Sequence, residues 1–143
     1  MRAVVDTNVI ASAVLIRRGN ERRILDAWRY GAFDLVTSPP LLDELGRVLS
    51  YPRIRNARWM TDREVAELLE VIAAESVVVA GSLDVNASRD PNDNMFLAAA
   101  VEGGADYVVS GDRDLLTLKA YRSVQIVRSA AFLAVLSRRH PRP

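Results

Sequence analysis

Five short runs of mostly apolar residues alternate with helix-like segments along this 143-residue chain, and this alternation most restricts its fold. The runs largely lack the polar–apolar alternation of half-exposed strands, which is typical of strands buried on both faces of a parallel sheet. We therefore predict an α/β domain with helices on both faces of the sheet. The predicted strands cover residues 3–5, 33–37, 77–79, 107–109 and 124–127.

The segments between these runs carry familiar start and stop signals of helices. Ser38 before Pro39 places a capping hydroxyl ahead of a proline in the first helical position. Thr61 and Glu64 form a capping box, and Gly31 is a typical residue just after a helix. The predicted helices cover residues 9–16, 20–30, 39–50, 62–75, 91–102, 112–118 and 130–136.

Residues 1–143 are expected to form a single domain, because no repeat, linker or low-complexity tract divides them. The last residues, about 138–143, are expected to be a basic tail. No apolar stretch approaches the roughly 18 residues of a membrane span, and the first residues lack the apolar core of a signal peptide. We therefore expect a cytoplasmic protein with no membrane association.

The chain has no cysteine and a single histidine, His140, which lies near the end of the chain. Disulfides, thiolate zinc sites, cysteine nucleophiles and histidine-based triads are therefore excluded as the basis of its function. A metal ion in this protein would need oxygen ligands, which favours Mg²⁺ or Mn²⁺.

The net charge of +1 conceals two basic segments. Residues 47–63 contain five arginines and one acid, Asp62, and residues 128–143 contain four arginines and no acid. Basic faces beside separate clusters of aspartate are typical of proteins that bind a polyanion around a metal. A solvated surface with internal salt bridges explains the same pattern.

Two aspartates follow predicted strands and are therefore expected at the carboxyl edge of the sheet. Asp6 comes directly after the first strand, and Asp112 comes just after the fourth. Binding sites of open α/β sheets lie at this edge, near the point where the strand order reverses. Capping of the following helix is the alternative role for each aspartate.

Two further acids are predicted to point inward from helices. Asp93 lies on the same predicted helix face as the apolar residues Phe96 and Leu97. A carboxylate on this inward face is costly unless it is hydrogen-bonded, paired or bound to metal. Glu44 borders the buried stripe of the 39–50 helix, whereas Asp43 points nearly the opposite way. The alternatives are a second capping acid for Asp93 and a surface acid for Glu44.

Carboxylates gathered around one cleft repel each other, so some would stay protonated without a cation. A divalent cation resolves this conflict, can activate water, and can stabilise in-line attack on a phosphodiester. The basic segments would then hold the nucleic-acid backbone. The sequence thus predicts a metal-dependent nuclease centre.

The order and spacing of four motifs resemble those of the PIN-domain ribonucleases over nearly the whole chain. The resemblance implies a three-layer α/β/α fold around a five-stranded parallel sheet of order 3-2-1-4-5. It also implies an Mg²⁺- or Mn²⁺-dependent endoribonuclease that acts on single-stranded or structured RNA. The motifs are Val4-Val5-Asp6-Thr7-Asn8, Ser38-Pro39 with Leu42-Asp43-Glu44-Leu45, Asp90-Pro91-Asn92-Asp93-Asn94 with Phe96-Leu97-Ala98, and Ser110-Gly111-Asp112-Arg113-Asp114-Leu115.

The resemblance also implies partners and site residues. The residue patterns of the last two motifs most resemble those of toxin components of prokaryotic toxin–antitoxin pairs. This resemblance implies a homodimer and a cognate antitoxin protein. On matching positions, catalysis and metal binding fall to Asp6, Glu44, Asp93 and Asp112, with Asp114 as a further metal ligand and Thr7, Asn8, Ser38 and Ser110 in supporting positions.

Other protein classes share parts of this pattern. A haloacid-dehalogenase phosphatase needs a second aspartate two positions after the first, where this chain has Asn8. A receiver domain needs an aspartate after the third strand, where this chain has Ala80 and Gly81. A non-catalytic RNA-binding module on the same fold, an RNA-maturation nuclease and a DNA-directed nuclease remain alternatives.

Self-association is predicted from a cluster of aromatic residues. Trp28, Tyr30, Tyr51 and Trp59 lie in one helix-rich segment, and aromatic residues are enriched in interface cores. Packing inside the domain is the alternative explanation for this cluster.

Overall fold

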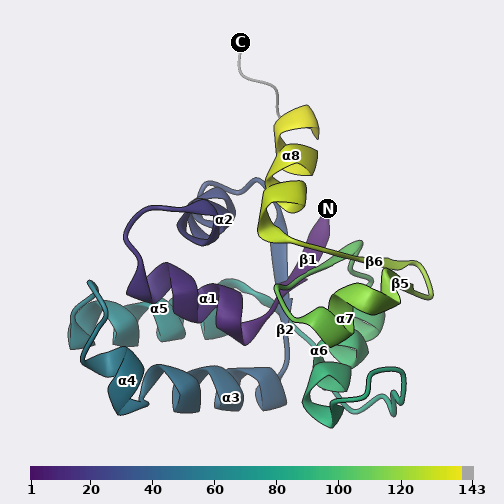
Figure 1. Ribbon diagram of the computed structural model, residues 1–143, viewed down its shortest axis with the longest axis horizontal. Helices are drawn as coiled ribbons and strands as arrows, with labels where there is room; N and C mark the ends of the chain where they lie inside the picture. The colour runs from purple at the N-terminus through teal and green to yellow at the C-terminus, as the bar shows by residue number, and fades with distance from the viewer. Residues whose placement is uncertain (140–143) are drawn as a thin grey trace.

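Six strands form one sheet in the computed structural model, which describes residues 1–139 (Figure 1). Their order is β3-β2-β1-β4-β6-β5, so β1 lies in the interior between β2 and β4. Every neighbouring pair is parallel except β5 and β6, which are antiparallel. The strands are β1 (Arg2–Val5), β2 (Asp34–Thr37), β3 (Val77–Val78), β4 (Tyr107–Val109), β5 (Ala120–Tyr121) and β6 (Val124–Val127).

Eight helices occur among residues 1–139, and four of them begin at a side chain that becomes important below. Asp6, Ser38, Asp90 and Asp112 each accept a hydrogen bond from a backbone N–H of the first turn that follows. The helices are α1 (Thr7–Leu15), α2 (Asn20–Arg29), α3 (Pro39–Leu49), α4 (Pro52–Arg55), α5 (Asp62–Glu75), α6 (Pro91–Glu102), α7 (Arg113–Leu118) and α8 (Ser129–Arg139).

Two buried clusters lie on opposite faces of the sheet, as the apolar strands predict. Ala3 and Val5 of β1 pack in the cluster that includes residues of α1, α2, α3, α5 and α8. Val4 packs in the other cluster, with residues of α6 and α7. Because successive strand residues point to opposite faces, both faces of β1 must be covered by helices. The predicted α/β architecture is therefore confirmed.

The predicted five-stranded parallel sheet is wrong by one strand. The five predicted strands are present and parallel in the order 3-2-1-4-5, with β6 as the predicted fifth strand. The additional strand, β5, joins β6 through a two-residue turn at residues 122–123. Lys119 and Arg122 have positive φ angles of 62° and 53°. Turns of this kind are normally marked by Gly, Asn or Asp, so this one carries no recognisable signal.

Several boundaries differ from the prediction by one to three residues, and two differences change what a residue does. Pro52, predicted only as a helix stop, is the first residue of the one-turn helix α4. Arg138 and Arg139, expected at the start of a basic tail, are the last residues of α8, and residues 140–143 of that expected tail lie outside the described residues. No helix in the described part of the chain is long and apolar enough to span a bilayer.

A long irregular loop, residues 79–90, connects β3 to α6 and is held at both ends. The Glu102 carboxylate accepts hydrogen bonds from the backbone N–H groups of Gly81 and Leu83. Near its other end, Asn94 Oδ1 accepts from the N–H groups of Ala87 and Ser88, at 3.2 and 2.8 Å. The loop therefore has a defined path where it approaches the first turn of α6.

Candidate metal centre

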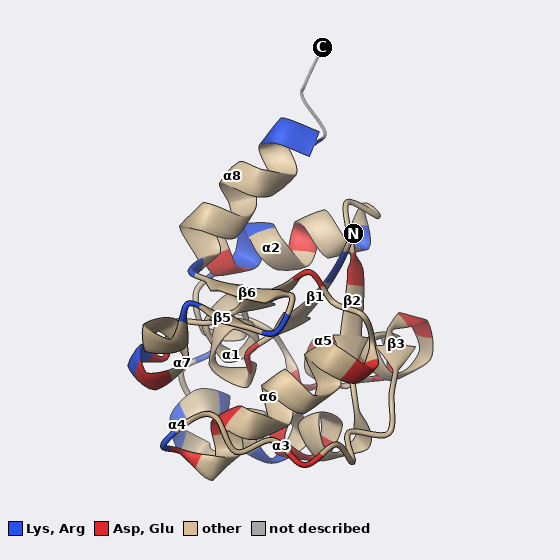
Figure 2. Ribbon diagram, turned by 90° about the vertical axis from the view of Figure 1, so that its right-hand side faces the viewer, with Lys and Arg blue, Asp and Glu red and all other residues tan. Residues whose placement is uncertain are grey.

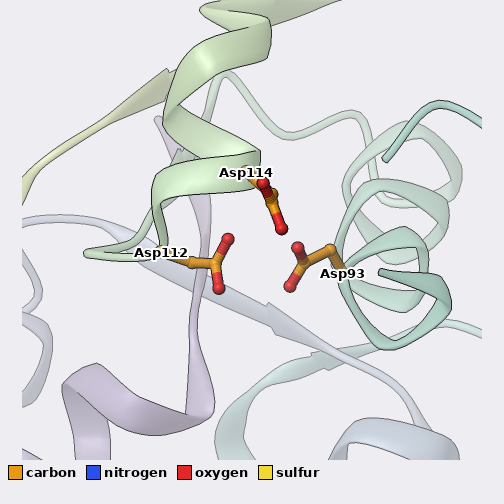
Figure 3. Close-up of side chains that lie close together, drawn as sticks. All are labelled: Asp93, Asp112 and Asp114. Atoms are coloured by element: carbon orange, nitrogen blue, oxygen red, sulfur yellow. The ribbon is translucent and has the colours of Figure 1, made fainter. Parts of the chain in front are cut away.

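Three aspartates meet where the first turns of α6 and α7 face each other (Figure 3). Asp93 extends from α6, Asp112 caps α7, and Asp114 lies in the first turn of α7. One carboxylate oxygen from each lies within 4.8 Å of one from each of the other two. Oxygens at this spacing can share one divalent cation, because Mg²⁺ and Ca²⁺ bind carboxylate oxygens at about 2.0–2.6 Å.

Asp93 is the most constrained of these three side chains. Asp90 caps α6, so Asp93 falls in the first turn and faces the interior, where it is 5% exposed. Its Oδ2 accepts a hydrogen bond from the Ser88 hydroxyl at 3.0 Å. The inward position predicted for Asp93 is therefore found, and the loop before α6 supplies a hydrogen-bond donor to its carboxylate.

Asp6 lies beside this cluster, at the carboxyl end of β1. It is 3% exposed, and its Oδ1 accepts a hydrogen bond from the Asn8 N–H at 3.0 Å. Its Oδ2 accepts from the Ser110 hydroxyl at 2.6 Å, and Ser110 Oγ in turn accepts from the Asp112 N–H at 2.9 Å. Ser110 therefore connects the aspartates that follow β1 and β4.

Glu44 approaches the same region from α3. Its Oε2 is buried and has no hydrogen-bond partner, whereas the neighbouring Asp43 is exposed. Burial raises the pKa of Glu44, and the negative charge of Asp6 raises it further. An orphaned, buried carboxylate oxygen is costly unless a ligand satisfies it. A cation beside Asp6 and Glu44 would do so.

The negative charges of the clustered acids repel one another, and burial adds to the cost of ionising them. Burial raises the pKa of Asp93 from 3.8 to about 7, with the Ser88 hydrogen bond opposing the shift and the charge of Asp112 adding to it. Burial also raises the pKa of Asp6, against the hydrogen bonds from Ser110 and Asn8 and together with the charge of Asp112. Two causes thus act together, desolvation and like charge. The oxygen-only donor set and the unsatisfied Glu44 oxygen fit a divalent cation.

The four supporting positions have different surroundings. Ser110 contacts Asp6 directly, and Thr7 is buried and lowers the pKa of Glu44 through its side chain. Asn8 is exposed and contributes its backbone N–H to Asp6. Ser38 is buried, and its hydroxyl accepts from the Leu41 N–H at 3.4 Å. This hydrogen bond caps α3 and involves no acid.

Sequence reasoning missed Ser88 and Asn94. Ser88 lies in the irregular 79–90 loop, outside every motif, and it donates to Asp93 while Asn94 accepts from the Ser88 backbone. Asn94 precedes Leu97 and Ala98 by three and four positions, which places it on the inward face of α6, and this was the available signal, since buried amides are almost always hydrogen-bonded. The residues that it would bind could not be named from the sequence.

The basic segment at 47–63 is partly neutralised by its own neighbours (Figure 2). Asp62 pairs with both Arg55 and Arg58, and Arg63 pairs with Glu67. Both interpretations of this segment therefore apply to different arginines. Arg53 forms no ion pair with another described residue, and the charge of Arg47 lowers the pKa of Glu44.

The aromatic cluster is divided between the interior and the surface. Trp28 is buried, and the Trp59 indole N–H donates to the Ala13 carbonyl at 3.0 Å while Arg22 lies over its ring. Tyr30 and Tyr51 are 91% and 43% exposed. Packing inside the domain therefore accounts for the two tryptophans and leaves the two tyrosines on the surface.

Comparison with known proteins gives two matches. A family model described as PIN domain matches residues 2–114, a span that contains every acid described above. The chain is also 31% identical over 119 residues to an uncharacterized protein of Methanocaldococcus jannaschii. That match covers 83% of this chain and 76% of the archaeal protein.

Proposed function

Because this chain belongs to the PIN domain family, whose members are typically metal-dependent nucleases that act on RNA, we propose that it is an Mg²⁺- or Mn²⁺-dependent endoribonuclease. Its substrate would be single-stranded or structured RNA. The observation that carries the proposal is the cluster formed by Asp93, Asp112 and Asp114, with Asp6 and Glu44 beside it. A non-catalytic RNA-binding module has no need for a group of acids in which two, Asp6 and Asp93, are buried at a cost in desolvation.

We assign the cation to Asp6, Glu44, Asp93 and Asp112, with Asp114 as a further ligand. When bound, a divalent cation would lower the pKa of water and offset the charge that builds up on the phosphate. The protein's own task is to hold these carboxylates in place. Ser110 fixes the orientation of Asp6, and Ser88 fixes that of Asp93.

Water is the proposed nucleophile, because nothing in the chain besides the clustered carboxylates could supply a nucleophile or a tuned base. It contains no cysteine and one histidine, and that histidine, His140, lies beyond the acid motifs. Hydrolysis by water would leave a 5′-phosphate and a 3′-hydroxyl. Products that end in a 2′,3′-cyclic phosphate would contradict this assignment, since they require attack by the RNA 2′-hydroxyl.

Incubation of the purified protein with a mixed pool of RNA tests the proposal directly. We expect cleavage with Mg²⁺ or Mn²⁺ and none with EDTA, followed by recovery when excess metal is restored. Activity that persists in EDTA would contradict metal dependence. Cleavage of single-stranded DNA alone would contradict the assignment of RNA as substrate.

Ser88→Ala should weaken Mn²⁺ binding by about tenfold, because residues that orient metal ligands typically contribute 10–100-fold to affinity. The change removes the hydroxyl that donates to Asp93 Oδ2. Titration calorimetry on metal-free protein measures the effect, and Ser82→Ala, at an exposed position of the same loop, is the control. Equal affinities in the two variants would show that Ser88 does not position Asp93.

We further propose that this activity belongs to the toxin of a toxin–antitoxin pair, with a cognate antitoxin protein as partner. The residue patterns at 90–94 and 110–115, which resemble those of toxin components, support this proposal. An adjacent reading frame that encodes a small protein with a DNA-binding N-terminus and a flexible tail is expected, and that protein should suppress cleavage. A chain that instead cuts one precursor RNA at a single position would be a maturation nuclease.

A homodimer is proposed on the basis of the exposed aromatic residues Tyr30 and Tyr51. Light scattering at micromolar concentration should give twice the 15.8 kDa of the chain. A monomer at these concentrations would contradict the proposal.

A further inference from the structure

A pocket of about 600 Å³ opens beside the acid centre and shares residues with it. Asn8, Ser110 and Asp112 line the end nearest the acids. Arg113 and Arg128 line it too, and Arg128 is the residue that follows β6 and precedes α8 (Figure 1). The pocket therefore runs along the carboxyl edge of the sheet, from the metal centre toward the start of α8.

The two arginines are available for a ligand. Both are exposed, and neither forms an ion pair within the described part of the chain. Arginine binds phosphate oxygens with two parallel N–H donors, which makes it the common residue for this purpose. The pocket thus carries acids suited to a cation at one end and guanidinium groups suited to an anion elsewhere in its lining.

The beginning of α2 adds to this anion preference. Asn20 and Glu21 also line the pocket, and Gly19, which precedes α2, provides no side-chain cap for its first N–H groups. Free N–H groups at a helix start favour an anion, although Glu21 offsets part of this effect.

The lining residues also indicate which part of a nucleotide would be recognised. The volume is in the range of pockets that hold drug-sized ligands, which is room for about one nucleotide. No aromatic side chain lines the pocket, so it offers no stacking platform for a base. Hydroxyl, amide and guanidinium groups suit the phosphate and the ribose instead.

We propose that this pocket holds the phosphate and ribose next to the scissile phosphate of a bound RNA strand, with Arg128 as the main phosphate ligand and Arg113 as a second. The proposal rests on the endoribonuclease function proposed above and adds the direction in which the strand leaves the acid centre, toward α8. Because the contact is to the backbone, it contributes affinity and does not select a sequence.

Binding of a short fluorescent single-stranded RNA to Asp6→Asn protein, which is not expected to cleave, tests this subsite. Arg128→Ala in that background should weaken binding by about tenfold, the loss expected for one charge-assisted contact. It should also reduce the slope of log affinity against log salt by about 0.7, because one phosphate contact is lost. Arg128→Lys should retain the salt slope but regain only part of the affinity.

Arg138→Ala is the matched control, since Arg138 is exposed at the far end of α8, the helix that begins just after Arg128. It should change affinity by less than about twofold. In the cleaving protein, Arg128→Ala should raise KM more than it lowers kcat, as expected for a group that binds substrate and transition state equally. Thermal unfolding of each variant checks that the fold is unchanged.

The outcomes separate this inference from the proposed function. RNA cleavage by the wild type, with Arg128→Ala and Arg138→Ala equal in affinity and salt slope, would overturn the subsite and leave the nuclease assignment intact. Arg128-dependent RNA binding without cleavage would overturn the nuclease assignment alone.

Discussion

Asp6→Asn should lower RNA cleavage by on the order of 100-fold or more while leaving the fold and RNA affinity largely intact. Losing a residue that only orients a metal ligand typically costs about 10–100-fold, and Asp6 is proposed as a ligand itself. Asparagine has nearly the same volume, its oxygen can still accept from the Asn8 N–H, and its amide can donate to Ser110 Oγ. The hydrogen bond from the Asn8 N–H therefore survives, the one with Ser110 reverses its direction, and the negative charge is lost.

Asp43→Asn is the control for Asp6→Asn, because it removes the same charge from an exposed residue next to Glu44. Cleavage of a labelled RNA by both variants, together with RNA binding in the presence of Ca²⁺ or EDTA, measures the difference. Asp6→Asn protein that cleaves as fast as Asp43→Asn protein would remove Asp6 from the proposed centre.

Metal-free protein should lose stability as the pH rises from about 4 to about 7, and Asp93→Asn should remove much of that loss. Burial raises the pKa of Asp93 from 3.8 to about 7, so the folded state binds more protons than the unfolded state across this window. Stability falls with pH wherever the folded state binds more protons. The raised pKa values of Asp6 and Glu44 act in the same direction.

Thermal unfolding in EDTA at pH 8 should therefore give a higher Tm for Asp93→Asn than for the wild type. Excess Mn²⁺ should reverse this order, because a ligand that binds only the folded state stabilises it, and the variant lacks one carboxylate to bind it. Asp84→Asn, at an exposed loop position, should follow the wild type in both conditions. If the Tm of the wild type changed with neither pH nor Mn²⁺, the proposed repulsion between the charges at this centre would be contradicted.

The main architecture was predictable because its signals are local. Runs such as Val4-Val5 and Val108-Val109 are too apolar for an exposed strand, and the caps Ser38, Thr61 and Asp90 mark helix starts within a few residues. Strand β5 escaped prediction because two residues carry no periodicity and Arg122 takes a positive φ without being glycine. Its existence depends on pairing with β6.

The candidate site was predictable only in part, for a related reason. Asp6 and Asp112 follow strands directly, and strand position alone brings them to one edge. Ser88 reaches Asp93 only through the path of a loop that Asn94 and Glu102 hold, and such a path depends on contacts between separate segments. The proximity of the Asp114 carboxylate to that of Asp93 likewise depends on how α6 and α7 face each other.

The interior position of β1 determines when the centre can first exist in a growing chain. β1 pairs with β2, which follows soon after it, and with β4, which is synthesised about 100 residues later. At the usual 5–20 residues per second, the ribosome needs roughly 5 to 20 seconds to add those residues. Asp6 leaves the ribosome early, whereas Asp112 and Asp114 emerge last among the five acids. A nascent chain therefore carries an incomplete centre, and that chain cannot perform the proposed cleavage until α7 has emerged.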